Sequence, residues 1–176
     1  MKRNKEPLNT EYRFCSKCGH SLSVKVIKPG EAERLVCSNC NSTTYIDPKI
    51  AVGSIIIIAG KIVLLKRAIE PSYGKWVFPG GYVNRGEVLE HAAARETKEE
   101  ANLDVKIENL LNAYSYPNEP VIVIVYTAKV IGGRIMPRDE TLEAKTFSFS
   151  EIPWDELAFT STRDALKDFL VYLKQQ

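Results

Sequence analysis

Residues 81–103 read GYVNRGEVLEHAAARETKEEANL and decide the fold of this 176-residue chain. From about residue 88 to residue 101 the stretch favours a helix, because Ala, Leu, Glu, Lys and Arg dominate and neither Gly nor Pro interrupts it. At about 100° per residue, Glu96 and Glu100 fall on the same face as the apolar Leu89. We therefore expect these carboxylates to face the protein rather than solvent alone.

Carboxylates on one helix face repel one another, at roughly 0.2–0.5 kcal/mol per pair and more where water is partly excluded. A divalent cation offsets this repulsion, and Mg²⁺ is typically held by one or two carboxylates with water and substrate phosphates. Arg95, near Glu99 and within reach of a folded-back Glu87, could fix the geometry of the loop. The alternative is a solvated charged helix, against which the apolar neighbours of the carboxylates argue.

The same stretch resembles the Nudix box. That motif has, in order, Gly, five residues, Glu, seven residues, Arg-Glu, an apolar position, any residue, Glu-Glu, any residue, Gly and an apolar position. Residues 76–83, WVFPGGYV, also look like the usual lead-in. Thr97 and Asn102 depart from the pattern, standing where a larger apolar residue and a glycine are common. Asn tolerates the left-handed backbone that a helix end often needs, and neither departure removes a metal ligand.

The resemblance implies a Nudix-type α/β/α sandwich with a mixed sheet, which also suits strands mixed with two flanking helices. It implies Mg²⁺- or Mn²⁺-dependent hydrolysis of a nucleoside diphosphate linked to another moiety, in which metal ions neutralise phosphate charge and activate the attacking water. Glu87 and Arg95 would orient the site, and Glu99 could be a ligand or lie just behind the ligands. The groups that would bind the metal are Glu96, Glu99, Glu100 and the backbone carbonyl of Gly80.

In many Nudix enzymes a further acid outside the box completes the metal site or acts as the base. By that resemblance Glu143, just before a predicted strand, is our first candidate for this role, and Glu140 is the second. Solvation of a loop is the alternative for both.

Substrate recognition is predicted from flat and cationic side chains near the box. A nucleobase or flavin needs flat partners, and an arginine at the end of a strand could contact phosphate. The alternatives are core positions for the aromatic residues and a surface cation for the arginine. The predicted substrate-binding residues are Arg67, Trp76, Phe78, Tyr82 and Tyr114.

All four cysteines lie in two C-x₂-C pairs, Cys15 with Cys18 and Cys37 with Cys40. The separation of the pairs is that of zinc ribbons, and four thiolates suit tetrahedral Zn²⁺ in a closed, structural site. Disulfides are the alternative, disfavoured because residues 1–6 do not read as a secretory signal. A redox-active C-x₂-C pair is another alternative, but redox-active pairs occur singly, whereas this chain has two pairs.

A zinc ribbon ahead of a Nudix domain resembles NADH pyrophosphatases and also enzymes that cleave FAD or ADP-ribose. Residues 114–120, YSYPNEP, do not match the downstream signature of the NADH group, whereas residues 151–159, EIPWDELAF, look more like the second group. We therefore expect FAD or ADP-ribose as substrate, giving AMP with FMN or ribose 5-phosphate. NADH and nucleoside triphosphates are the alternative substrates.

Composition predicts a cytoplasmic protein with no membrane span, because the longest apolar run, residues 54–59, is far below the roughly 18 residues required. The resemblance implies a small-molecule nucleotide substrate. The net charge of +2 does not indicate nucleic-acid affinity. The resemblance implies a homodimer. One non-catalytic alternative is nucleotide sensing, against which the intact glutamates of the box argue. Another is binding of nucleic acid or protein by the ribbon, against which the basic residues of 14–46 argue, because acidic residues are mixed with them.

The expected organisation is a flexible tail over residues 1–13, a zinc ribbon over 14–46 and a Nudix domain over 47–176. Within the ribbon, residues 28–31 predict the hairpin turn. Strands are predicted at 50–58, 61–66, 104–114, 121–130 and 144–149, and a final amphipathic helix at 161–174.

Overall fold

The structure is a computed structural model that describes residues 12–175, and it divides into two compact units between Asp47 and Pro48. The predicted flexible tail, residues 1–13, lies almost wholly outside the described residues. The first unit is an antiparallel sheet in the order β1-β2-β3. Its strands are β1 (Leu22–Val26), β2 (Glu33–Cys37) and β3 (Thr43–Thr44). The predicted turn joins β1 to β2, with the Glu31 N–H donating to the Lys28 carbonyl at 3.1 Å.

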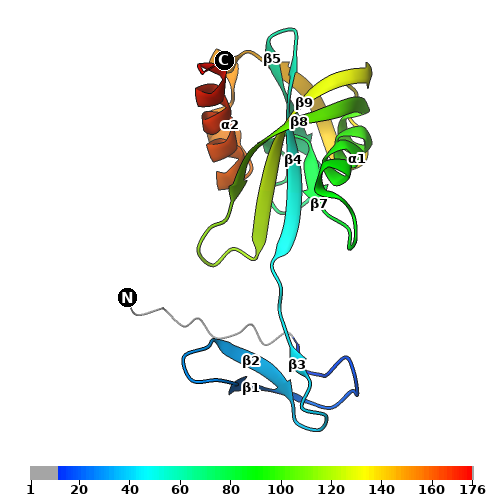
Figure 1. Cartoon of the computed structure of the whole chain (residues 1–176). Coiled ribbons are helices and arrows are strands. Elements are labelled where there is room, and N and C mark those ends of the chain that lie inside the picture. The colour runs from blue at the N-terminus through cyan, green and yellow to red at the C-terminus, as the bar shows by residue number, and fades with distance from the viewer. Residues whose placement is uncertain (1–11, 176) are drawn as a thin grey trace. The chain divides into compact units, whose positions relative to one another are not determined.

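The second unit is a mixed sheet with a helix on each side (Figure 1). Its order is β10-β5-β4-β9-β8; β6 pairs with β5, and β7 pairs with β4. β4 and β9 are parallel and the other pairs antiparallel, which confirms the predicted sandwich. The strands are β4 (Lys49–Ile58), β5 (Lys61–Arg67), β6 (Trp76–Val77), β7 (Gly80–Tyr82), β8 (Leu103–Tyr114), β9 (Val121–Gly133) and β10 (Thr141–Phe147). The helices are α1 (Leu89–Ala101), α2 (Thr160–Leu173) and the 3₁₀ turns η1 (Phe149–Glu151) and η2 (Trp154–Glu156).

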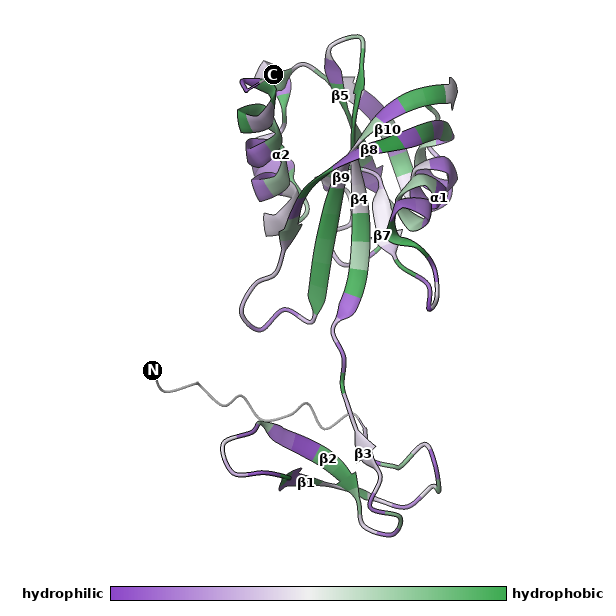
Figure 2. Ribbon diagram, viewed as in Figure 1, coloured by the Kyte–Doolittle hydropathy of each residue, from purple (hydrophilic) through white to green (hydrophobic). Residues whose placement is uncertain are grey.

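Both faces of this sheet are apolar because side chains alternate along the central strands. Ile55 packs toward α2, together with Leu166 and Phe169, whereas its neighbour Ile56 packs toward α1, together with Ala101. Figure 2 shows the hydrophobic residues of β4 and β9 between the two helices. The sheet therefore carries a core on each face and holds both helices in place.

The helix bounds follow the prediction closely, and their ends show why. Asn102 ends α1 in the left-handed conformation, φ 56°, with its N–H donating to the Lys98 carbonyl at 3.1 Å. This is the role expected of an Asn in place of Gly. The buried apolar stripe of α2 ends before the helix does, because Leu173 in its last turn is 38% exposed.

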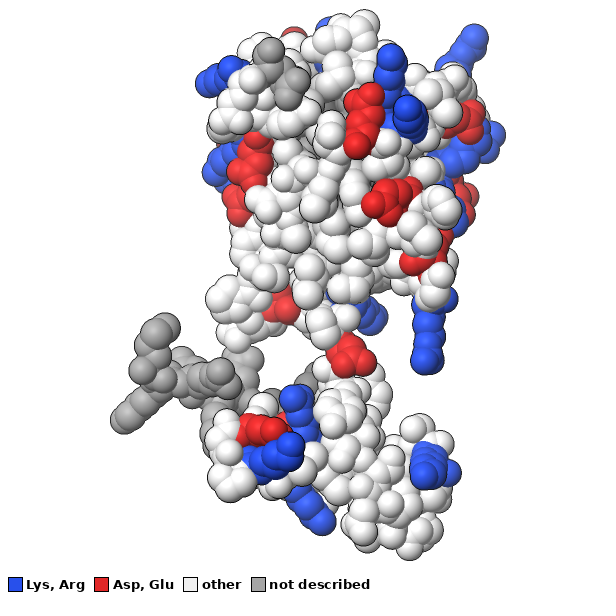
Figure 3. Space-filling model, viewed as in Figure 1, with Lys and Arg blue, Asp and Glu red and all other residues white. Residues whose placement is uncertain are grey.

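Two differences from the predicted strands matter for the site. β10 begins at Thr141 rather than 144, with an irregularity in its register between Thr141 and Glu143. The lead-in to α1 contains two short strands, β6 and β7, that were not predicted. On the face drawn in Figure 3, basic and acidic side chains are interspersed over the second unit. Among residues 12–175 no helix is long and apolar enough to cross a membrane.

Candidate active site

Helix α1 lies close to the sheet because its inner face is made of small residues. Ala92 and Ala93 are fully buried and pack in one cluster with Val52 of β4. Thr97, at a position where a larger apolar residue is common, is also fully buried, and its hydroxyl donates to the Ala93 carbonyl at 2.8 Å. This bond from side chain to backbone therefore satisfies the one polar side-chain atom that Thr97 brings into the core.

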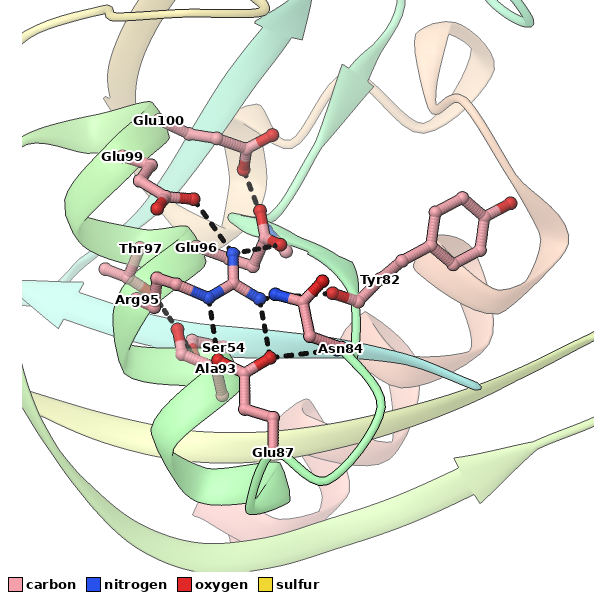
Figure 4. A network of polar contacts seen from close by, with 11 residues as sticks. Ser54, Tyr82, Asn84, Glu87, Ala93, Arg95, Glu96, Thr97, Glu99 and Glu100 are labelled. Carbon is pink, nitrogen blue, oxygen red and sulfur yellow. Dashed lines mark hydrogen bonds and ion pairs between the residues drawn. The ribbon is translucent and has the colours of Figure 1, made fainter. Parts of the chain in front are cut away.

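Arg95 donates hydrogen bonds to three of the glutamates of the site (Figure 4). Its Nε and Nη2 donate to both oxygens of Glu87, at 2.7 and 2.9 Å. Its Nη1 donates to Glu96 at 2.7 Å and to Glu99 at 2.9 Å, and Nη2 also reaches the carbonyl of Tyr82 at 3.2 Å. One guanidinium thus fixes the loop before α1 and two glutamates of the helix.

Charge pairing controls the pKa of Glu87. The hydrogen bonds from Arg95 hold the pKa of Glu87 at about 2, with a further contribution from the Asn84 N–H, which donates to it at 2.9 Å. The same contacts, led by Glu87, raise the pKa of Arg95 further above its ordinary value. Both groups are therefore charged across the physiological pH range, so the ion pair between Glu87 and Arg95 does not depend on pH there.

Burial has the opposite effect on the two glutamates nearest the sheet. It raises the pKa of Glu100 to about 7, although the Gly80 N–H donates to its carboxylate at 2.8 Å and opposes the shift. Burial also raises the pKa of Glu96, against the influence of Arg95. A carboxylate whose charge is poorly solvated gains most from a cation, so these two groups are suited to hold a metal.

Glycine makes room for one of these carboxylates. A Cβ atom on Gly81 would lie 2.5 Å from Glu96 Oε2, so a larger residue at this point of β7 would displace the Glu96 carboxylate. Glycine at this position, 14 residues before Arg95, therefore leaves the Glu96 carboxylate in place.

The glutamates open into a cavity of about 1160 Å³ in the second unit. Among the predicted site residues, the structure brings together on its wall Arg67, Phe78, Gly80, Tyr82, Arg95, Glu96, Glu99, Glu100 and Glu140. Glu140 also lies close enough to Glu100 to raise the pKa of Glu100 by charge repulsion. These predicted residues therefore bring carboxylates, two arginines and two aromatic rings to the cavity.

Four predicted residues are not among those that line this cavity. Trp76 is in the core, edge-on to Phe147 at a centroid distance of 4.9 Å. Tyr114 is also buried, and its hydroxyl donates to Asp168 at 2.8 Å. Glu87 acts on the site through Arg95. Glu143 pairs with Lys145 on β10.

The wall also includes residues that the sequence did not single out as site residues. Pro117 follows β8, and Phe159, Thr160, Ser161 and Thr162 form the start of α2. An aromatic residue followed by three hydroxyl residues at a helix start was the available signal. It was weak, because such residues are common at helix N-termini for capping alone.

The four cysteines of the first unit converge. Sγ–Sγ distances are 3.8 Å for Cys15–Cys40 and 3.4 Å for both Cys18–Cys37 and Cys18–Cys40. A tetrahedron of thiolates about 2.3 Å from a zinc ion has edges of about 3.8 Å, so the donor set fits that ion. Backbone N–H groups of Cys40 and Asn39 lower the pKa of Cys37 to about 6, which favours the thiolate.

Within residues 12–175 this cysteine cluster is the one group of three or more possible metal ligands whose donor atoms lie within 4.8 Å of one another. The box glutamates have not converged in this way. Two of them, Glu96 and Glu99, are directed to Arg95, and Glu100 is directed to the Gly80 N–H.

Comparison with known proteins now adds to this geometry. Residues 47–169 match the family model described as NUDIX domain, and residues 13–46 match the model described as Nudix N-terminal. The chain belongs to the Nudix family. The sequence resemblance is therefore confirmed, and the chain is a Nudix hydrolase with an N-terminal four-cysteine ribbon.

Two relatives frame the chemistry of this Nudix hydrolase. An ADP-ribose pyrophosphatase of Methanocaldococcus jannaschii is 36% identical over 156 residues, covering 86% of each chain. A protein of Deinococcus radiodurans named NAD-capped RNA hydrolase NudC is 29% identical over 170 residues, and the match spans 93% of this chain but 58% of the relative. These matches support the general pyrophosphatase reaction, the cleavage of a phosphoric anhydride.

Solved structures agree on the fold. A Nudix hydrolase from Nitrosomonas europaea superposes with a TM-score of 0.83 at 38% identity, covering 88% of each chain. An ADP-ribose pyrophosphatase from Streptococcus suis has a TM-score of 0.56 at 22% identity, covering 70% of this chain and 92% of its own, which supports the fold alone.

Proposed function

We propose that this Nudix pyrophosphatase hydrolyses ADP-ribose to AMP and ribose 5-phosphate. The observation that carries the proposal is the likeness to an ADP-ribose pyrophosphatase over 86% of each chain, beside the family matches to the ribbon and to the hydrolase domain of this chain. FAD, the other substrate predicted from the sequence, has no counterpart among these relatives. The NudC relatives favour a nicotinamide dinucleotide, the predicted alternative, as the second candidate.

The catalytic metal would be Mg²⁺ or Mn²⁺, held by Glu96, Glu99 and Glu100 with the backbone carbonyl of Gly80. When bound, it would neutralise charge on the phosphate oxygens and lower the pKa of the attacking water. Glu96 and Glu100 supply poorly solvated carboxylates on the inner side of the cavity, and the more exposed Glu99 supplies one at its edge. Arg95 keeps two of these carboxylates aligned, and Glu87 keeps Arg95 in place.

Glu140 is the stronger candidate for the base or additional ligand. It lines the cavity and interacts with Glu100, whereas Glu143 pairs with Lys145. Replacing Glu140 by Gln should therefore lower kcat by about 10²-fold, a typical contribution of one acid–base group. Glu143→Gln is the matched control and should leave kcat nearly unchanged. A larger loss of kcat in Glu143→Gln than in Glu140→Gln would instead assign the role of base or additional ligand to Glu143.

The zinc ion of the ribbon would be structural, because four cysteine thiolates leave no open coordination position. The homodimer, too, stays a prediction from the resemblance to Nudix proteins. Neither proposal changes the chemistry assigned to the cavity.

The substrate proposal is tested by chromatography of products. Purified full-length protein with Mg²⁺ is incubated in parallel with ADP-ribose, FAD, NADH and nucleoside triphosphates. AMP with ribose 5-phosphate as the fastest-formed products supports the proposal. Preferred cleavage of NADH or FAD would replace the substrate, and no cleavage of any compound by metal-loaded protein would favour nucleotide sensing.

A further inference from the structure

The first turn of α2 faces the cavity without a cap. Phe159 holds the N-cap position, no side chain caps the turn, and the turn contains no acidic residue. Helices leave their first N–H groups without acceptors inside the helix. Here the Arg163 N–H donates to the Phe159 carbonyl at 3.2 Å, while the N–H groups of Thr160, Ser161 and Thr162 have no acceptor among residues 12–175.

Thr162 adds a hydroxyl that no protein group satisfies. Its side chain is 1% exposed and lines the cavity, and its Oγ1 is the one buried side-chain oxygen or nitrogen without a partner in the described part of the chain. Buried hydroxyl groups are almost always hydrogen-bonded, to protein, ordered water or a ligand, so this unpaired hydroxyl in a residue of the cavity wall is available to a partner from outside the chain.

Arg67 and the start of the helix favour an anion as that partner, although acidic residues such as Glu70 and Glu119 line other parts of the same cavity. The guanidinium of Arg67 lies 5.0 Å from the ring centroid of Phe159, and its charge also acts on Glu100 at the metal-binding end. Asp164, the acidic residue one turn into α2, accepts a hydrogen bond from the Tyr116 hydroxyl at 2.7 Å and is not among the residues that line the cavity. The helix dipole adds a partial positive charge at the same end.

We propose that the first turn of α2 binds a phosphate group of the substrate, through the N–H groups of residues 160–162 and the hydroxyl of Thr162, with Arg67 beside it. This inference rests on the proposed function, because it assigns a second binding subsite in the same cavity. The phosphate could be the phosphoryl group of the diphosphate that the box glutamates do not engage, or a separate phosphate ester on a ribose.

The direct test is an NMR titration of the zinc-loaded, full-length protein, without added Mg²⁺, with inorganic phosphate at constant ionic strength. The amide signals of residues 160–162 should shift and saturate. Thr162→Val keeps the side-chain volume but removes the hydroxyl, and should weaken phosphate binding about tenfold, the effect of one hydrogen bond to a charged group. Thr127→Val, which removes a buried threonine hydroxyl of β9 outside the cavity, is the control and should bind phosphate like the wild type.

Kinetics then distinguish the two sources of phosphate. If the diphosphate occupies the subsite, Thr162→Val should raise KM about tenfold for both ADP-ribose and its 2′-phosphate. If a ribose phosphate occupies it, only the 2′-phosphate should be affected. Absence of saturable shifts at residues 160–162, equal phosphate binding by Thr162→Val and wild type, or shifts with adenosine but not phosphate would overturn the inference. The titration involves no turnover, so its result stands even if ADP-ribose is not the substrate.

Discussion

In the ribbon, four cysteine sulfurs already lie 3.4–3.8 Å from their neighbours, whereas in the hydrolase domain the box glutamates are held by protein groups. The ribbon has few buried apolar side chains and leaves Phe14 and Tyr45 largely exposed. The hydrolase domain has a core on both faces of its sheet. The difference indicates that the cysteine site supports the fold of its unit, while the glutamate site depends on a fold that is already stable.

Cys37→Ser should show the largest effect, confined to the ribbon. Zinc binding by such sites contributes about 10 kcal/mol or more to folding, and removing one thiolate leaves the ion incompletely bound. We expect loss of zinc by elemental analysis and loss of dispersed NMR signals for residues 14–46, with unchanged signals for residues 48–175. Retained zinc with unchanged ribbon signals would contradict a structural zinc site.

Glu100→Gln should have the complementary effect, on activity rather than on the fold. The change removes a ligand charge, so we expect kcat/KM with Mg²⁺ to fall by about 10²–10³-fold, the scale of losing one preorganised charged group. Glu90→Gln, on the exposed first turn of α1, is the matched control. Activity of Glu100→Gln within a few-fold of the wild type would remove Glu100 from the ligand set.

The same substitution should stabilise the metal-free domain at high pH. Because burial raises the pKa of Glu100 from 4.5 to about 7, the unfolded chain releases this proton at a lower pH than the folded chain does. The stability of the metal-free protein therefore falls as the pH rises through this window, by up to roughly 3 kcal/mol. Glu100→Gln removes the loss, so its Tm in EDTA should exceed that of the wild type at pH 8 but not at pH 4. An equal Tm difference at both pH values would refute the assignment.

Glu87→Gln should give a smaller loss, because Glu87 acts through Arg95. The amide cannot match the two charged hydrogen bonds to the guanidinium, so Glu96 and Glu99 lose their alignment. We expect Mg²⁺ affinity or kcat to fall about 10–100-fold, typical for groups that orient metal ligands. Glu108→Gln, an exposed residue of β8, is the control and should behave like the wild type. If Glu87→Gln also behaves like the wild type, the ion pair between Glu87 and Arg95 is not needed to align Glu96 and Glu99.

The contrast between the regions also explains what the sequence could predict. Spacing predicted the cysteine cluster, and helix-favouring residues without Gly or Pro predicted α1, because both signals are local in the sequence. The short strand β7 escaped prediction, since Gly80-Gly81-Tyr82 has little strand propensity and pairs only because β4 lies beside it.

Two features of the cavity depend on tertiary structure in the same way. Whether Glu140 or Glu143 faces the cavity follows from the irregular start of β10, which no local pattern specifies. The unpaired hydroxyl of Thr162 exists only because α2 packs against the sheet and buries it. Residue types therefore indicated the chemistry, whereas the shape of the cavity required the fold.

The most direct test of the glutamate site is a crystal structure of the full-length protein with Mn²⁺ and a non-hydrolysable ADP-ribose analogue, with anomalous scattering recorded to locate the metal. Anomalous peaks within about 2.3 Å of carboxylate oxygens of Glu96 and Glu100, beside the analogue's diphosphate, are the predicted result. Mn²⁺ bound elsewhere, with these carboxylates still directed to Arg95 and Gly80, would contradict the account.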